Sequence, residues 1–134
     1  MEMLVNIDSD DLEKAVAFYR DALGLQAGRR LFDGSVVEMT GASSKIHLLA
    51  KAPGSAGSSQ AAIYRSYGRH WTPVHLDFEV EDIERAVSRA VATGAILETE
   101  IQTFSWGLIA TLSDPFGHGF CLLQFIGKGY DEVA

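Results

Sequence analysis

The sequence contains little cysteine and little positive charge. Cys121 is the single cysteine among 134 residues, so no disulfide framework can form within the chain. Only 11 Lys and Arg stand against 18 Asp and Glu, which gives a formal net charge of -7. Nucleic-acid-binding and anionic-membrane-binding surfaces need a basic face. We therefore expect a small-molecule or protein partner, with no nucleic acid and no membrane among the partners.

Long apolar runs and a secretion signal are also missing. No apolar run approaches the roughly 20 residues that are needed to cross a bilayer. The stretch Met1–Asp8 carries two acids and no basic residue, whereas a secretion signal begins with positive charge and continues into an apolar segment. Together with the single cysteine, these features predict a cytoplasmic protein.

The sequence does contain a repeated pattern. Residues 4–16 read LVNIDSDDLEKAV, and residues 75–87 read HLDFEVEDIERAV, with acids, alanine and valine at matching offsets. A second match links KIHLL at 45–49 with GFCLL at 119–123. Because the two matches keep the same order, we interpret the chain as two tandem copies of one module.

Each half begins with the pattern of a strand followed by that of a helix. Apolar and polar residues alternate at 5–8 and 75–80, and apolar stripes at helical spacing follow within 12–23 and 83–91. Three shorter strands are predicted after each helix, at 26–32, 35–40 and 45–51 and at 96–102, 108–113 and 119–125, with Asp33-Gly34 as a hairpin signal. The predicted organisation is a β-α-β-β-β module at 1–51, a linker or loop at 52–72, a second module at 73–126 and a tail at 127–134.

The linker region contains an unusual group of aromatic and cationic residues at 64–71, YRSYGRHW. The interpretation we favour is an ordered linker whose aromatic rings pack on a sheet. The alternative is a lid or rim that presents Arg65 or Arg69 to an anionic substrate.

The strand alternation predicts a polar face opposite each helix. Helices bury their apolar stripe on one face of a sheet, so the other face carries Asn6 and Asp8 in the first half and His75, Asp77 and Glu79 in the second. Asp77 and Glu79 are candidates for proton transfer, although solvated or ion-paired acids would look the same. The candidates for binding a substrate are Asn6, Arg69, His75 and Trp106. Trp71, Phe104 and Trp106 could line a pocket for a planar ligand or simply pack in a core or dimer interface.

The repeat also predicts where a metal could bind. It makes Leu4 equivalent to His75 and His47 equivalent to Cys121. Imidazole and thiolate are ligands of divalent transition metals, so His47, His75 and Cys121 form a candidate set. The alternative is that the histidines are hydrogen-bonded pocket residues and the cysteine an inert core thiol, because no HxxxH, HExxH or CxxC spacing is present.

Three segments resemble the vicinal oxygen chelate superfamily, which includes glyoxalase I, bleomycin-resistance proteins and extradiol dioxygenases. They are DLEKAVAFYRDALGL at 11–25, HLDFEVED at 75–82 and LSDPFGHGFCL at 112–122. The resemblance implies an α+β fold in which two tandem β-α-β-β-β modules form a cup-shaped mixed sheet around a ligand cleft. A homodimer frequently completes this cleft, and the chain could either close its own cleft or exchange modules with a second copy. The resemblance also implies metal ligands at Leu4, His47, His75 and Cys121. Since leucine cannot bind a metal, this four-ligand set is incomplete, and glyoxalase I activity itself is not expected.

Two functions remain open from the sequence. The first is a glyoxalase- and bleomycin-resistance-like protein that binds an aromatic or cationic small molecule in its cleft. The second is a lyase, isomerase or dioxygenase that uses one divalent metal (Zn, Mn, Fe or Ni) on a substrate with vicinal oxygens. Leu4 and Cys121 favour the first function, whereas His47 together with His75 favours the second.

Overall fold

The computed structural model describes residues 1–59, 63–71 and 73–134. The chain divides into two compact units, Met1–Gly68 and Arg69–Ala134. Part of the predicted linker, residues 60–62 and 72, lies outside the described residues. Among the described residues, no helix is long and apolar enough to cross a membrane.

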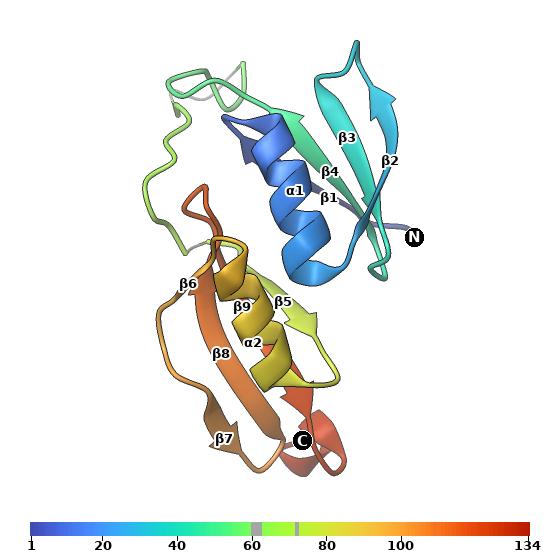
Figure 1. Cartoon of the computed structure of the whole chain (residues 1–134), viewed down its shortest axis with the longest axis vertical. Coiled ribbons are helices and arrows are strands. Elements are labelled where there is room, and N and C mark those ends of the chain that lie inside the picture. The colour runs from blue at the N-terminus through green and yellow to red at the C-terminus, as the bar shows by residue number, and fades with distance from the viewer. Residues whose placement is uncertain (60–62, 72) are drawn as a thin grey trace. The chain divides into compact units, whose positions relative to one another are not determined.

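The first unit is a four-stranded mixed sheet with one helix (Figure 1). Its elements are β1 (Leu4–Ser9), α1 (Leu12–Leu23), β2 (Gln26–Leu31), β3 (Val36–Thr40) and β4 (Lys45–Ala50). The strand order is β1-β4-β3-β2, in which β1 and β4 are parallel and the other pairs are antiparallel.

The second unit repeats this plan. Its elements are β5 (Leu76–Glu79), α2 (Ile83–Ala92), β6 (Ile96–Leu97), β7 (Gln102–Phe104), β8 (Gly107–Ser113), β9 (Gly119–Phe125) and the short 3-10 helix η1 (Gly129–Glu132). The strand order is β5-β9-β8-β6, β7 also pairs with β8, and β5 and β9 are parallel. The predicted strand 96–102 is thus interrupted and forms two short strands. The two β-α-β-β-β modules of the predicted α+β fold are confirmed.

Aspartates fix the start of both helices. The Asp11 carboxylate accepts a hydrogen bond from the Lys14 amide at 3.1 Å, and Asp82 accepts one from the Arg85 amide at 3.0 Å. Such N-caps satisfy amides that have no partner within the helix. The first helix ends at Gly24, which adopts a left-handed φ of 73° that glycine tolerates best.

The helices bury their apolar stripes against the sheets. Ala15 of α1 and Ala90 of α2 are fully buried, as are Leu48 of β4 and Leu122 of β9. Each unit therefore has its core on the helix-covered face of its sheet, and the polar positions of the strands fall on the other face. The candidate site residues on the strands therefore lie on the sheet face that the helix leaves uncovered.

The hairpin between β2 and β3 has Asp33-Gly34 at its centre, as the sequence predicts. Leu31 pairs with Val36, so residues 32–35 form the loop, in which Phe32, Asp33 and Gly34 have positive φ of 52°, 54° and 87°. The Gly34 amide donates to the Leu31 carbonyl at 3.1 Å and closes this turn. Positive φ suits Asp33 and Gly34, whereas Phe32 carries a Cβ and belongs to the residues that rarely adopt it.

Candidate functional site

The sheet register brings the polar residues of each unit into one row. In the second unit Asp77 lies opposite Cys121, which lies opposite Thr111. In the first unit the corresponding row is Asn6, His47 and Glu38. Residues directly opposite in a ladder share a face, so each row lies on the face away from the helix. The register gives His47 and Cys121 equivalent places in the two modules.

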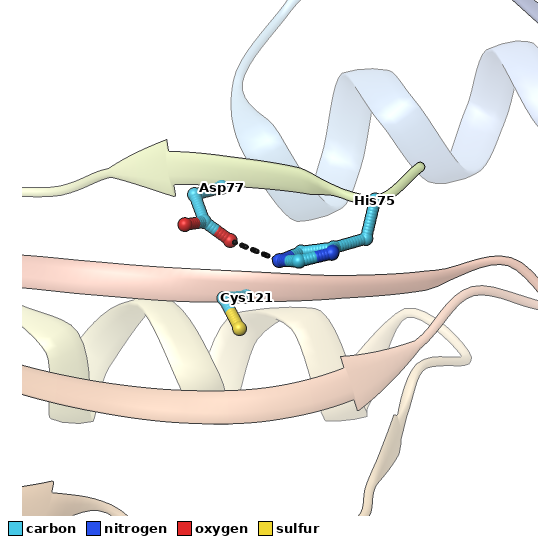
Figure 2. A group of neighbouring side chains, drawn as sticks. All are labelled: His75, Asp77 and Cys121. Atoms are coloured by element: carbon cyan, nitrogen blue, oxygen red, sulfur yellow. Dashed lines mark ion pairs between the residues drawn. The ribbon is translucent and has the colours of Figure 1, made fainter. Parts of the chain in front are cut away.

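Three side chains of the second unit form a cluster of metal-ligand type (Figure 2). His75, just before β5, and Asp77, on β5, point toward each other, with His75 Nε2 3.4 Å from Asp77 Oδ1. Cys121 projects from the neighbouring strand β9. One ligand atom from each of the three residues lies within 4.8 Å of the others. Of the predicted set His47, His75 and Cys121, this cluster contains the last two and adds Asp77.

The thiol of this cluster is held in its neutral form. Cys121 is only 3% exposed, and burial, followed by the negative charge of Asp77, raises the pKa of its thiol to about 11. The Thr111 hydroxyl lies 4.0 Å from Sγ. Because the thiolate is the reactive form of cysteine, the free thiol is a poor nucleophile at neutral pH. A metal at this place would have to displace the thiol proton.

Trp71 is the site residue that the sequence analysis did not connect with His75. Its ring stacks on the His75 imidazole, with ring centroids 4.3 Å apart and an angle of 19° between the planes. The ring also lies over Gly119, where any side chain would collide with it. Trp71 lies outside the repeat, so the repeat could not place it. The signal in the sequence was Gly119, because a glycine within a strand often marks a place where another group approaches the backbone closely.

The two arginines considered for an anionic substrate are paired with carboxylates. Arg69 Nη2 donates to Glu98 Oε2 at 2.6 Å, and the Arg69 guanidinium lies 5.5 Å from the Trp71 ring centroid. In the first unit Arg65 Nε donates to Asp8 Oδ2 at 2.5 Å. These pairs support the interpretation of 64–71 as an ordered segment.

His47 has a carboxylate partner inside the first unit. Glu38 Oε2 lies 3.6 Å from His47 Nε2 and 2.8 Å from Arg29 Nη2. The hydrogen bond from Arg29 is the main cause that lowers the pKa of Glu38 to about 2, so this acid is ionised at neutral pH. Asn6 is exposed and lies opposite His47 in the register, and Leu4 is exposed and apolar. The first module thus presents an ion-pair network where the second presents the three-residue cluster.

Trp106 and Glu79 lie away from His75 within the second unit. Trp106 packs in an aromatic cluster with Phe104, Phe125 and Tyr130. The neighbouring Gly107 pairs with Phe125, at the opposite end of β9 from the Cys121 pair. Glu79 lines an open hollow of about 360 Å³ together with Val80, Glu81, Gln124 and Phe125. The structure therefore does not bring Trp106 and His75 together, and it places Glu79 beside a hollow that Asp77 does not line.

Comparison with known proteins agrees with this architecture of two repeated mixed modules. Residues 4–123 match the family described as "Glyoxalase-like domain". The chain belongs to this glyoxalase-like family, which is consistent with the vicinal oxygen chelate superfamily. The sequence matches no curated protein.

Several solved structures share the fold. One is a glyoxalase/bleomycin resistance protein/dioxygenase family enzyme from Burkholderia phytofirmans PsJN, with 20% identity over 92% of this chain and 97% of that one, at a TM-score of 0.72. Another is a lactoylglutathione lyase from Agrobacterium tumefaciens, with 20% identity over 92% of both chains and a TM-score of 0.63. At such identities the likeness shows the fold, and function has to be argued from the site.

Proposed function

We propose that this glyoxalase-like protein binds a small planar cation at His75 and Asp77, without a complete four-ligand metal site. The observation that carries this proposal is the exposed His75 ring, stacked on Trp71 and 3.4 Å from the Asp77 carboxylate. Aromatic faces attract planar groups and cations, and a carboxylate selects for positive charge. The apolar Leu4 at one of the four expected metal positions also supports binding over metal chemistry.

The charge environment of Asp77 supports a cationic ligand. The carboxylates of Asp8, Glu38 and Glu98 each pair with an arginine. The partner of Asp77 is an imidazole instead, and the Cys121 thiol beside it is neutral. The negative charge of Asp77 is therefore neutralised less than the other three, which favours a positively charged group at this place.

A fluorescence titration tests this proposal. In a Trp106→Phe variant, Trp71 is the remaining tryptophan and reports on the site. We expect a planar aromatic cation to change its emission with saturation, while the neutral and anionic isosteres bind more weakly. Asp77→Asn should weaken cation binding about tenfold, which corresponds to ~1.4 kcal/mol.

The matched control is Glu84→Gln, which removes one carboxylate from the first turn of α2 on the other side of the same unit. Cation affinity should stay unchanged in this variant. Equal affinity for the cationic, neutral and anionic isosteres would contradict the proposal, and so would an Asp77→Asn variant that binds like the wild type.

A metal-dependent enzyme is the second candidate, and the three-residue cluster is the observation that favours it. Imidazole, carboxylate and thiolate are all zinc ligands with bonds of roughly 2.0–2.3 Å, and three donor atoms within 4.8 Å of one another fit such a site after small side-chain movements. His75, Asp77 and Cys121 would hold the metal, which would supply Lewis-acid activation of a substrate with vicinal oxygens. The Trp71 ring would keep the His75 imidazole oriented.

Metal content after incubation with Zn²⁺, Mn²⁺, Fe²⁺ or Ni²⁺ and desalting tests this second candidate. A metal-dependent enzyme requires near-stoichiometric metal in the wild-type protein. This metal should be lost in both Asp77→Asn and Cys121→Ser but retained in His47→Gln. Metal that is retained in Asp77→Asn and lost in His47→Gln would support the ligand set His47, His75 and Cys121 that the family resemblance implies. No retained metal in the wild type would reject tight binding by either set.

A further inference from the structure

The segment Arg69–Trp71, called the strap below, is attached to the end of β9 by backbone hydrogen bonds. The His70 amide donates to the Gly117 carbonyl at 2.8 Å, and the Gly119 amide donates to the His70 carbonyl at 3.0 Å. These bonds form an isolated parallel bridge between His70 and His118. Two hydrogen bonds are a small attachment for a backbone segment, so the strap depends on its side chains to stay in place.

Each residue of the strap has one side-chain anchor in the second unit. Arg69 forms an ion pair with Glu98. The His70 ring lies against the His118 ring, with Nε2 of His70 2.6 Å from Nδ1 of His118. The Trp71 ring rests on His75. The strap therefore covers one face of the His75 ring when the two histidines are in contact.

The contact between the two histidines depends on their protonation. At 2.6 Å one ring nitrogen donates its proton and the other must accept it through a lone pair. When both rings are protonated, no lone pair remains and two cations face each other. The closed contact is therefore compatible with at most one positive charge on the pair.

The surrounding charges only partly offset this repulsion. Asp114, buried in the turn between β8 and β9, favours protonation of His70, whereas Arg69 on the strap opposes it. Glu98 offsets the charge of Arg69. His75 stacks on the Trp71 ring, and its charged neighbour Asp77 lies 3.4 Å from the His75 ring. Burial and the charge of His118 lower the pKa of His70 below its ordinary value of 6.5.

We propose that the strap is a pH-sensitive cover: protonation of both His70 and His118 detaches Arg69–Trp71 from β9 and lifts the Trp71 ring off His75. The direction of the pH dependence follows from proton linkage, because the open strap binds more protons than the closed strap. The closed form is therefore fully favoured above about pH 6.5 and loses stability as the pH falls below it. This inference goes beyond the proposed function and requires no ligand.

Amide hydrogen exchange by NMR tests the proposal without a ligand. The His70 and Gly119 amides are protected by the strap bonds, so their exchange, corrected for the intrinsic rate, gives the opening equilibrium. Between about pH 7.5 and about pH 5 we expect opening to increase, approaching tenfold per pH unit where the open form holds one more proton. The Val80 amide, which donates to the Leu123 carbonyl further along β9, is the internal control and should not respond.

The variant His118→Asn removes one titrating ring and keeps a hydrogen-bonding amide. Its strap should open to the same extent at both pH values. In the wild type, the midpoint of opening should coincide with the NMR titration of the His70 and His118 rings, a comparison that needs no variant. Opening that is independent of pH in the wild type, unchanged pH dependence in His118→Asn, or a midpoint displaced from both histidines would overturn the proposal.

Discussion

At the scale of single residues, the hairpin tip shows where sequence and backbone conflict. Phe32 has a φ of 52° and a side chain that is 77% exposed. A left-handed conformation costs residues with a Cβ roughly 1–2 kcal/mol, and asparagine tolerates it better than most. The exposed ring recovers little of this cost by packing.

Replacing Phe32 by asparagine should therefore stabilise the protein by about 1 kcal/mol, measured by urea denaturation. The control is Phe32→Ala, which removes the ring but keeps the unfavourable conformation. Alanine should give clearly less stabilisation than asparagine. If both variants gain equally, loss of the exposed ring and not relief of backbone strain would explain the effect.

At the scale of secondary-structure elements, Glu38 connects three strands of the first sheet. Its carboxylate on β3 receives Arg29 from β2 at 2.8 Å and lies 3.8 Å from Lys45 Nζ and 3.6 Å from His47 Nε2 on β4. Because the pKa of Glu38 falls from 4.5 to about 2, the folded state binds the proton less readily than the unfolded chain. Its stabilising contribution is therefore present above about pH 4.5 and is lost as the pH falls toward 2.

We therefore expect Glu38→Gln to lower the free energy of unfolding at neutral pH, with a difference from the wild type that disappears near pH 2. Urea denaturation across this pH range measures both effects. Glu13→Gln is the control, since Glu13 pairs with Arg30 at 2.7 Å but is 71% exposed, and such surface pairs contribute little. A Glu38→Gln deficit that is constant with pH would contradict the electrostatic explanation.

At the scale of the whole molecule, the fold was predictable because the repeat and the strand alternation are encoded locally. The site was predictable only in part. Alternation places His75 and Asp77 on one face, and the repeat adds Cys121 to the same region. Neither the alternation nor the repeat shows how far along the strands two side chains lie from each other. Trp106 was therefore grouped with His75, although Trp106 packs at the other end of β9. The Trp71 stack depends on a close approach to Gly119 that no periodic pattern encodes.

NMR chemical-shift mapping during titration with a planar aromatic cation shows directly whether the ligand binds at His75 and Asp77. We expect the shifts to concentrate at Trp71, His75, Asp77 and Cys121 and to saturate together. Shifts concentrated on the aromatic cluster of Phe104, Trp106, Phe125 and Tyr130, or around His47 and Glu38 in the first unit, would contradict binding at His75 and Asp77.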